Sequence, residues 1–194
     1  MLYIIRHGQT ANNKKKLLQG RSDMSLNDKG FEQAESAREL FDSLGIEFDK
    51  VYTSPLKRAV ETASVVSGGA DIEIDDRLIE MDYGPYEGMD LTDPAPEVMA
   101  FFMDFAGTPA PDGMEQLDSV VGRLGEFLEE IRSEAMVRNI LISTHAIAMK
   151  GALEYLTPES RGSYWSTYIG NCAVYVSDTS EGTYMIPYEI TVNK

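Results

Sequence analysis

The stretch MLYIIRHGQTANN, residues 1–13, decides the expected fold and holds the first candidate site. Residues 2–5 are apolar and partly β-branched, and Gly8 closes the run, which favours a short buried strand over a helix. Arg6 and His7 follow at once, where open α/β sheets carry their chemistry. Arginine offers a planar fork of donors suited to phosphate, and a neutral imidazole can act as a nucleophile. Because so short a motif often occurs by chance, a strand end with a surface arginine and a structural histidine is the alternative.

Length and composition predict a single domain over residues 1–194. The chain is 43% hydrophobic and 25% charged, which is ordinary for a soluble globular protein with a sizeable core. The formal net charge of -15 repels nucleic acid and anionic membrane, so a negative ligand needs a local cationic pocket. The single Cys172 excludes an internal disulfide and a cysteine-rich metal site. No apolar run approaches the ~20 residues of a membrane span or suits a signal peptide, so we expect a cytoplasmic protein.

Strand-like and helix-like segments alternate along the chain. We expect strands over residues 2–5, 48–53, 72–74, 139–144, 172–177 and 184–192, and helices over about 28–44, 56–66, 94–105, 116–134 and from 146 onward. Asn27 or Asp28 can cap the first helix and Gly45 ends it. Ser54 and Pro55 have the residue types of an N-cap and a first helical position. The alternation predicts a three-layer α/β/α fold with a mainly parallel, mixed central sheet.

The section from about residue 91 to 113 is expected to be a helical insertion over the edge of the sheet. Pro94 and Pro96 open its helix, and the Gly- and Pro-rich residues 107–113 break it. Phenylalanines at helical spacing are more often core residues than ligand contacts, and a partly apolar pocket wall is the alternative.

Three of the expected strands are followed by polar side chains suited to chemistry. Arg6 and His7 follow the first strand, Ser54 and Arg58 the second, and His145 the strand 139–144. The carboxyl ends of parallel strands share one edge of a sheet, so we expect both histidines and two arginines to meet there. Four potential cations in one place are costly unless an anion fills the site, and a phosphate group fits. A metal is the rival ligand, but no third metal ligand has suitable spacing and the arginines repel a cation.

Two further stretches carry charges whose role the residues alone leave open. Lys14 to Lys16 form a basic run, which is usually a solvated loop and alternatively attracts an anion toward the site. Residues 77–88 form a loop shaped by Gly and Pro, with three carboxylates, Glu80, Asp82 and Glu87. In a chain with 32 acidic residues, each of them taken alone is expected to be ordinary surface.

Further motifs follow the first one in order along nearly the whole chain. Taken with their residue ranges, the patterns are R-H-G-E-T-x-x-N (6–13, with Gln9 for Glu), G-R-x-D-x-x-L-x-x-x-G (20–30), S-x-L-x-R-A-x-x-T-A (54–63), L-x-E-x-x-x-G-x-W-E-G (78–88, with Tyr86 for Trp), a weaker G-G-E-S (113–116) and S-H-G (144–146, with Thr144 for Ser and Ala146 for Gly). In this order the motifs resemble those of the histidine phosphatase superfamily, the phosphoglycerate mutase-like proteins.

The resemblance implies a phosphoryl-transfer site at the matching positions. It makes His7 the nucleophile that becomes phosphorylated and Glu80 the acid that protonates the leaving oxygen and then serves as base for water. The phosphoryl oxygens would be held by Arg6, Arg58 and His145, with Asn13 nearby. Three further residues, expected beside the substrate, are Gln19, Gly20 and Arg21. The resemblance implies no metal and no organic cofactor.

The resemblance also implies the overall reaction. It is hydrolysis of a small phosphomonoester through a phosphohistidine, with inorganic phosphate as product and with neither nucleic acid nor membrane as partner. A cofactor-dependent phosphoglycerate mutase is the first alternative, and the modest spacing before His145 favours hydrolysis over it. A phosphate- or phosphoprotein-binding relative without turnover is the second, and the intact motif residues argue against it. The particular phosphomonoester and the oligomeric state stay open.

Overall fold

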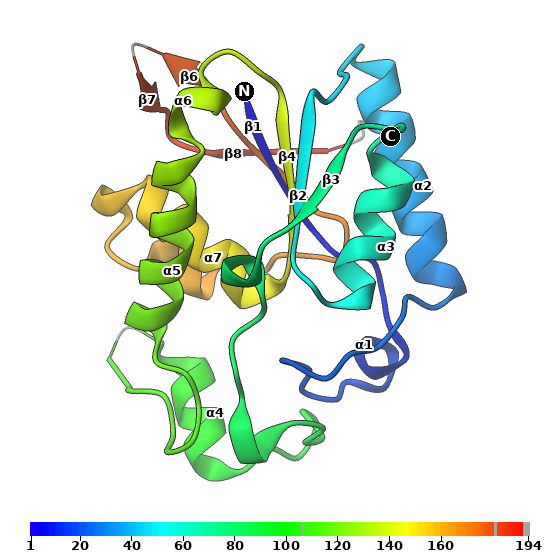
Figure 1. Cartoon of the computed structure of the whole chain (residues 1–194). Helices are drawn as coiled ribbons and strands as arrows, with labels where there is room; N and C mark the ends of the chain where they lie inside the picture. Colours follow the sequence, from blue (N-terminus) through cyan, green and yellow to red (C-terminus); the bar gives the residue numbers. More distant parts are fainter. Residues whose placement is uncertain (106, 181, 192–194) are drawn as a thin grey trace.

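The computed structural model describes residues 1–105, 107–180 and 182–191. A six-stranded sheet in the order β3-β2-β4-β1-β5-β8 lies at its centre (Figure 1). Its strands are β1 (Leu2–Arg6), β2 (Lys50–Thr53), β3 (Ile72–Ile74), β4 (Ile140–Thr144), β5 (Val174–Ser177) and β8 (Tyr188–Ile190). The pairs among β1, β2, β3 and β4 are parallel, and β5 pairs antiparallel with β1 and β8. The expected mixed and mainly parallel sheet is confirmed.

Helices cover both faces of this sheet. The helices α2 (Asp28–Ser43) and α3 (Lys57–Val66) lie on one face, and α5 (Leu117–Glu130) and α7 (Ala146–Leu156) lie on the other (Figure 1). Side chains of β1 alternate between the two resulting cores, because successive residues of a strand point to opposite faces. Leu2 and Ile4 belong to the core with α5 and α7, whereas Tyr3 and Ile5 belong to the core with Phe41 of α2. The three-layer α/β/α expectation is therefore confirmed.

Shorter elements complete the described part of the chain. They are α1 (Ala11–Lys15), α4 (Pro96–Met103), α6 (Arg132–Ala135), the two-stranded pair β6 (Thr179–Ser180) and β7 (Thr183–Tyr184), and the 3-10 turns η1 (Asp76–Leu78), η2 (Gly84–Tyr86), η3 (Pro158–Ser160) and η4 (Ser163–Ser166). No helix among the described residues is both long enough and apolar enough to span a membrane.

Several expected boundaries are confirmed and others are wrong. Asn27 caps α2 through its side chain, and Gly45 follows the helix with a φ of 67°, where glycine is favoured. Helix α3, however, begins at Lys57, and its N-cap residue is Leu56, which provides no side-chain cap. The Ser54 hydroxyl lies before the helix, where it accepts from the backbone N–H of Leu56 at 3.3 Å and from His145 Nε2 at 2.7 Å. The expected helix 116–134 is two helices, since the chain turns at Ile131 between α5 and α6.

Three other expected segments differ in detail. Of the basic run expected as a loop, Lys14 and Lys15 are the last residues of the helix α1, which begins with a reciprocal capping box of Thr10 and Asn13. Lys16 lies outside the helix as its C-cap, with a φ of 57°. The expected strand 184–192 is divided between β7 and β8, and residue 192 lies outside the described residues. Helix α4 ends before Phe105, and residue 106 of the expected insertion also lies outside the described part.

The strand order places the candidate residues at one edge of the sheet. Strand β4 lies between β1 and β2, with Arg6 opposite Thr144 and Thr53 opposite Ser143. The residues that follow these three strands therefore leave the sheet side by side. Burial determines this register, because all three strands are largely buried and a shift by one residue would exchange the side chains of their two faces.

Candidate active site

Three strand ends bring both histidines and Arg58 into direct contact. Arg58 donates from Nε to His7 Nε2 and to His145 Nδ1, each at 3.2 Å. The two imidazole rings have their centres 5.1 Å apart. Exposure of the side chains is 3% for His7 and 0% for Arg58 and His145, so the cluster is buried. The sequence expectation that these residues meet at one sheet edge agrees with this placement.

The hydrogen bonds of His7 determine which ring nitrogen is free to react. Nδ1 lies 2.7 Å from the carbonyl oxygen of Gly8, so Nδ1 carries the proton and donates it. Nε2 accepts from Arg58 and therefore holds a lone pair. Gly8 itself packs closely on α2, since a Cβ at this position would lie 2.4 Å from the carbonyl oxygen of Gly30. A neutral imidazole with a directed lone pair is the form that a nucleophile needs.

Burial keeps both histidines neutral. It lowers the pKa of His7 well below its usual value, and the charges of Arg58 and Arg6 lower it further. The pKa of His145 is lowered well below its usual value for the same reasons. The Nδ1 atom of His145 accepts from Arg58, so its Nε2 donates to Ser54 Oγ at 2.7 Å. The site is therefore electrostatically positive through its arginines and not through its histidines.

Backbone carbonyls hold Arg58 in place and use only some of its N–H donors. Nη1 donates to the carbonyl oxygen of Ser22 at 2.8 Å and Nη2 to that of Gly20 at 2.6 Å. Burial lowers the pKa of Arg58 to about 10, so the side chain is still charged at neutral pH. A guanidinium has five N–H groups. Three of them are used here, one on each of Nη1 and Nη2 for the two carbonyls and the Nε–H for the two histidines. Two N–H groups remain for an anion beside His7.

Arg6 supplies a second cation at the end of β1. Its Nη1 donates to the carbonyl oxygen of Ile169 at 2.6 Å. Its Nε is buried and has no hydrogen-bond partner among the described residues. A buried donor without a partner costs free energy, of the order of 1–3 kcal/mol, which an anionic ligand would recover. The donor set around His7 thus fits a phosphate group.

Glu80 is the carboxylate of the loop 77–88 that reaches this cluster. Its side chain is 3% exposed, and it accepts from the backbone N–H groups of Ile147 at 3.2 Å and Ala148 at 3.0 Å, in the first turn of α7. The N-terminus of a helix favours a carboxylate there. The loop is fixed nearby, because Thr144 Oγ1 donates to the carbonyl oxygen of Leu78 at 2.7 Å.

The other two acidic residues of the loop point elsewhere. Asp82 accepts from the backbone of Gly84 and pairs with Arg21 at 3.1 Å, and its side chain is 38% exposed. Glu87 accepts from the backbone N–H of Arg21 at 2.5 Å and braces the loop. Of the three carboxylates, Glu80 alone is buried against the histidine cluster.

The remaining sequence candidates lie around the cluster in different roles. Asn13 uses its Oδ1 to cap α1 and to accept from Asn171, which leaves its amide N–H groups for other contacts. Gln19 is buried and accepts from Thr10 at 2.6 Å, and its Nε2 lacks a partner among the described residues. Gly20 contributes the carbonyl that holds Arg58. Arg21 instead forms an ion pair on the half-exposed side of the loop.

Sequence reasoning missed Asn171 as a site residue. Its Nδ2 donates to the carbonyl oxygen of His7 at 3.0 Å. The start of β5 lies beside the end of β1, where Val174 is opposite Ile5. A polar residue just before a strand that neighbours β1 was the available signal, but the antiparallel pairing that gives it meaning comes from the fold.

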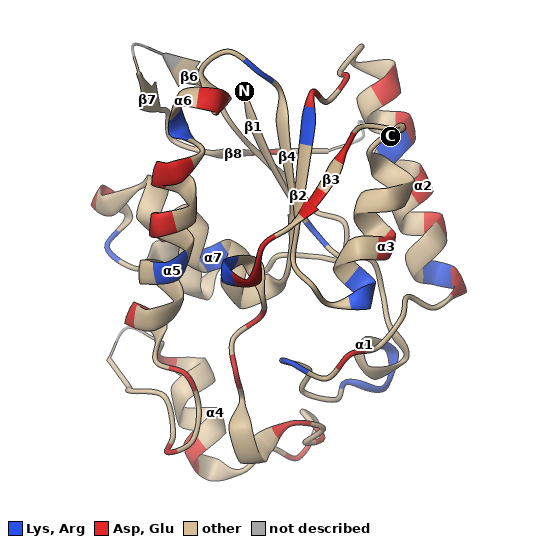
Figure 2. Cartoon of the chain, viewed as in Figure 1, with Lys and Arg blue, Asp and Glu red and all other residues tan. Residues whose placement is uncertain are grey.

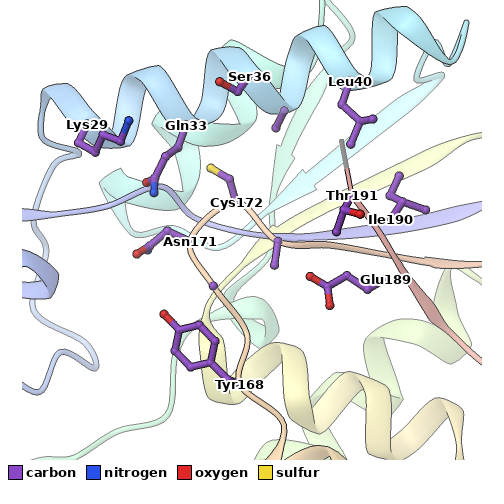
Figure 3. Close-up of a pocket in the computed structure, with 13 residues that line it drawn as sticks. Lys29, Gln33, Ser36, Leu40, Tyr168, Asn171, Cys172, Glu189, Ile190 and Thr191 are labelled. Atoms are coloured by element: carbon purple, nitrogen blue, oxygen red, sulfur yellow. The ribbon is translucent and has the colours of Figure 1, made fainter. Parts of the chain in front are cut away.

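A pocket of about 540 Å³, with Lys29, Gln33 and Tyr168 in its lining, is separate from the cluster of His7, Arg58 and His145 (Figure 3). It is bounded by α2, by the segment around Asn171 and Cys172, and by β8. Burial raises the pKa of the Cys172 thiol to about 12, so this cysteine is a weak nucleophile at neutral pH. Within the described ranges, no group of three or more His, Cys, Asp or Glu side chains gathers as a metal site.

Comparison with known proteins gives one family and a consistent set of relatives. The family model of the Histidine phosphatase superfamily (branch 1) matches residues 2–187. A broad-specificity phosphatase of Saccharomyces cerevisiae is 34% identical over 186 residues, which cover 91% of this chain and 78% of that protein. A 2,3-bisphosphoglycerate-dependent phosphoglycerate mutase of Parvibaculum lavamentivorans is 28% identical over an aligned region that covers 100% of this chain and 97% of the mutase.

Solved structures agree with the fold. The protein YhfR of Bacillus stearothermophilus superposes with a TM-score of 0.83 at 28% identity, over 95% of this chain and 94% of that one.

Proposed function

Because the chain belongs to the histidine phosphatase superfamily (branch 1), we propose that it is a phosphatase, which hydrolyses a small phosphomonoester through a phosphohistidine on His7. The observation that carries the proposal is the pair of hydrogen bonds on His7. Its Nδ1–H is bound to the Gly8 carbonyl, and its Nε2 lone pair faces Arg58, whose remaining N–H groups can bind phosphoryl oxygens.

The reaction has two steps in this proposal. In the first, His7 Nε2 forms a bond to phosphorus while the ester P–O bond breaks, and the leaving oxygen takes a proton from Glu80. In the second, the oxygen of a water forms a bond to phosphorus while the P–N bond to His7 Nε2 breaks, Glu80 takes up a proton from that water, and inorganic phosphate leaves. Arg6 and Arg58 hold the phosphoryl oxygens throughout, and His145 joins them once its Nδ1, which accepts from Arg58 in this structure, takes up a proton beside the bound dianion. Fixed donors around the transferring group are the main source of catalysis in such reactions.

A phosphoglycerate mutase is the second candidate function. The 28% identical mutase, which covers 100% of this chain, supports it. A mutase shares the phosphohistidine but returns the phosphoryl group to a second hydroxyl of the substrate instead of to water. The two functions therefore differ in the acceptor and not in the residues of the buried cluster.

One pair of assays separates these functions from each other and from a binding protein without turnover. The first measures phosphate release from p-nitrophenyl phosphate. The second follows 3-phosphoglycerate, with and without 2,3-bisphosphoglycerate, for release of phosphate and for formation of 2-phosphoglycerate. We expect hydrolysis that needs no bisphosphoglycerate. Isomer formation that depends on bisphosphoglycerate, with little phosphate release, would establish the mutase, and inactivity in both assays would leave a binding protein.

A further inference from the structure

Lys150 is a cation beside the candidate active site that the phosphoryl group does not need. It lies on α7, the helix whose first turn binds Glu80. Its Nζ donates to the carbonyl oxygen of Trp165 at 2.7 Å and lies 5.2 Å from the centre of the Phe105 ring. An ammonium has three N–H groups, so the contact with Trp165 leaves two of them for a ligand.

The surroundings of Lys150 connect it to the phosphoryl end of the site. The charges of Glu80 and Arg6 both act on its ammonium, Glu80 raising its pKa and Arg6 lowering it. Arg6 and Lys150 are also anchored on one short segment, since they donate to the carbonyls of Ile169 and Trp165 respectively. Burial removes part of the water around the Lys150 ammonium, and this loss lowers its pKa to about 8. A partly desolvated ammonium is stabilised by an anionic partner.

A row of aromatic rings, here called the aromatic wall, lies between Lys150 and the loop that holds Arg58. The wall consists of Tyr83, Phe102, Phe105 and Trp165. Its ring centres are 6.2 Å apart for Tyr83 and Phe102, 5.5 Å for Phe102 and Phe105, and 6.2 Å for Phe105 and Trp165. Tyr83 packs on Gly20, where a Cβ would come within 2.7 Å of its ring. The wall thus runs from the Gly20 carbonyl on Arg58 to Lys150.

The charge of the whole molecule makes such a lysine significant. Acidic residues are spread over the outer helices and loops (Figure 2), and the net charge is -15. A substrate with a second negative group is repelled by this field unless a cation meets that group locally. Arg6 and Arg58 are the cations that bind the phosphoryl group in the proposed function. Lys150 lies at the other end of the aromatic wall, where a second negative group of the substrate could reach it.

We propose that Lys150 forms a second anion subsite, which selects phosphomonoesters that carry a further anionic group, a carboxylate or a second phosphate, beyond the ester. The proposal rests on the proposed phosphatase function, because it assumes that the phosphoryl end of the ligand binds at His7. If Lys150 serves only to hold the turn at Trp165, its charge has no influence on which ligand binds.

A matched pair of ligands tests the subsite directly. Glycerol 3-phosphate and 3-phosphoglycerate have the same length and differ in a terminal CH2OH or carboxylate. We expect 3-phosphoglycerate to compete with p-nitrophenyl phosphate about 10-fold more tightly, as for one charge-assisted hydrogen bond. In Lys150→Met this ratio should fall to about 1, and in Lys150→Arg most of it should remain. Using the ratio within one variant cancels any damage that affects both ligands.

Lys50 provides a matched control variant. It also lies over an aromatic ring, 5.5 Å from the centre of Tyr52, and pairs with Glu73 at 2.8 Å, but it begins β2 at the opposite edge of the sheet. Lys50→Met should keep the wild-type ratio. A second pair, propane-1,3-diol bisphosphate against its monophosphate, repeats the measurement with phosphate as the distal group. The pair with the larger ratio identifies which anion the subsite takes.

The pH dependence tests the subsite without a variant that might lose its fold. The charged groups facing Lys150 are Glu80 and Arg6, and neither Phe105 nor Trp165 titrates. The wild-type ratio should therefore fall as pH rises from 7 past the lysine pKa of about 8, while Lys150→Arg should keep its ratio at pH 9.5. A wild-type ratio near 1 for both ligand pairs, or an undiminished ratio in Lys150→Met, would overturn the proposal.

The test of the Lys150 subsite can be distinguished from the test of the phosphatase function. If the wild-type protein fails to hydrolyse p-nitrophenyl phosphate, the phosphatase proposal fails. The ligand pairs can then be compared by calorimetry on His7→Ala and on His7→Ala with Lys150→Met. A ratio that depends on Lys150 in that experiment supports the subsite, and a ratio independent of it rejects the subsite.

Discussion

The buried cluster of His7, Arg58 and His145 and the aromatic wall that ends at Lys150 are built in different ways. The cluster lies at the ends of neighbouring strands, is at most 3% exposed, and is hydrogen-bonded to the loop carbonyls of Gly8, Gly20 and Ser22 and to the Ser54 hydroxyl. The wall comes from α4, η4 and loops outside the sheet, and Phe102 and Phe105 are only partly buried in it. In the two proposals, residues at the ends of the sheet strands carry the chemistry and the peripheral segments choose the substrate. Changes in the cluster should therefore affect all substrates alike, and changes in the wall should affect only the choice among them.

The largest effect is expected for His7→Ala. Removing the proposed nucleophile should lower kcat/KM by about 10⁴-fold or more, and by a similar factor for every substrate. The measurement is steady-state hydrolysis of p-nitrophenyl phosphate and of an alkyl phosphate, with Lys50→Met as control and thermal unfolding to verify the fold. Wild-type activity in His7→Ala would place the chemistry elsewhere.

Arg58→Lys should be the next most damaging change. A lysine keeps the charge but cannot bind Gly20, Ser22 and a phosphoryl group with one planar fork. We expect kcat/KM to fall by about 10²–10³-fold, as for the loss of a preorganised donor. Arg38→Lys on α2, where the arginine pairs with Asp42 at the surface, is the matched control. Near-normal kcat/KM in Arg58→Lys would remove this residue from the phosphate site.

Glu80→Gln should separate substrates by their leaving group. An alkoxide needs a proton as it departs, whereas nitrophenolate leaves without help, and positioned acid catalysis contributes about 10²–10⁴-fold. Phosphorylation of the enzyme, measured in single turnovers, should therefore slow far more for an alkyl phosphate than for p-nitrophenyl phosphate. Asp82→Asn, which changes a half-exposed carboxylate of the same loop, should show no such difference. Equal losses on both substrates would count against Glu80, and the selective loss in Asp82→Asn would transfer the role to Asp82.

The smallest expected effect concerns stability at acid pH, and it distinguishes the cluster from the wall. His7 and His145 stay neutral in the fold because burial lowers their pKa, but they bind protons in the unfolded chain below about pH 6.5. The unfolded state then binds more protons, so stability falls as pH drops, by about 1 kcal/mol per histidine at pH 5.5. Urea unfolding at pH 7.5 and 5.5 should show this loss, and His145→Gln should reduce it. A loss unchanged in His145→Gln would contradict the neutral assignment.

The same contrast explains what the sequence could predict. Apolar strands and the rule that parallel strands share a carboxyl edge were sufficient to place Arg6, His7 and His145 together. The hydrogen bond from His145 to Ser54 was missed, because residue type favoured Ser54 as a helix cap and only the packed structure offers it a histidine. Asn171 was missed as well, since its contact with His7 depends on an antiparallel neighbour 164 residues away in the chain.

The sequence predicted only part of the aromatic wall. Phenylalanines at helical spacing suit a core as well as a pocket wall, and in the structure Phe101 is fully buried in the core whereas Phe105 is only partly buried against it. Lys150 gave no signal, because a single lysine on a helix is usually at the surface. Its contacts with Trp165 and Phe105 come from segments that no local pattern brings together.

The most direct test of the account is to trap the phosphorylated enzyme. Wild-type protein is mixed with a radiolabelled phosphomonoester, quenched within milliseconds, and digested so that the labelled peptide can be identified by mass spectrometry. The account predicts an acid-labile, base-stable adduct on the peptide that contains His7, formed before phosphate is released and absent in His7→Ala. Release of phosphate with no adduct, or an adduct on a residue other than His7, would contradict it.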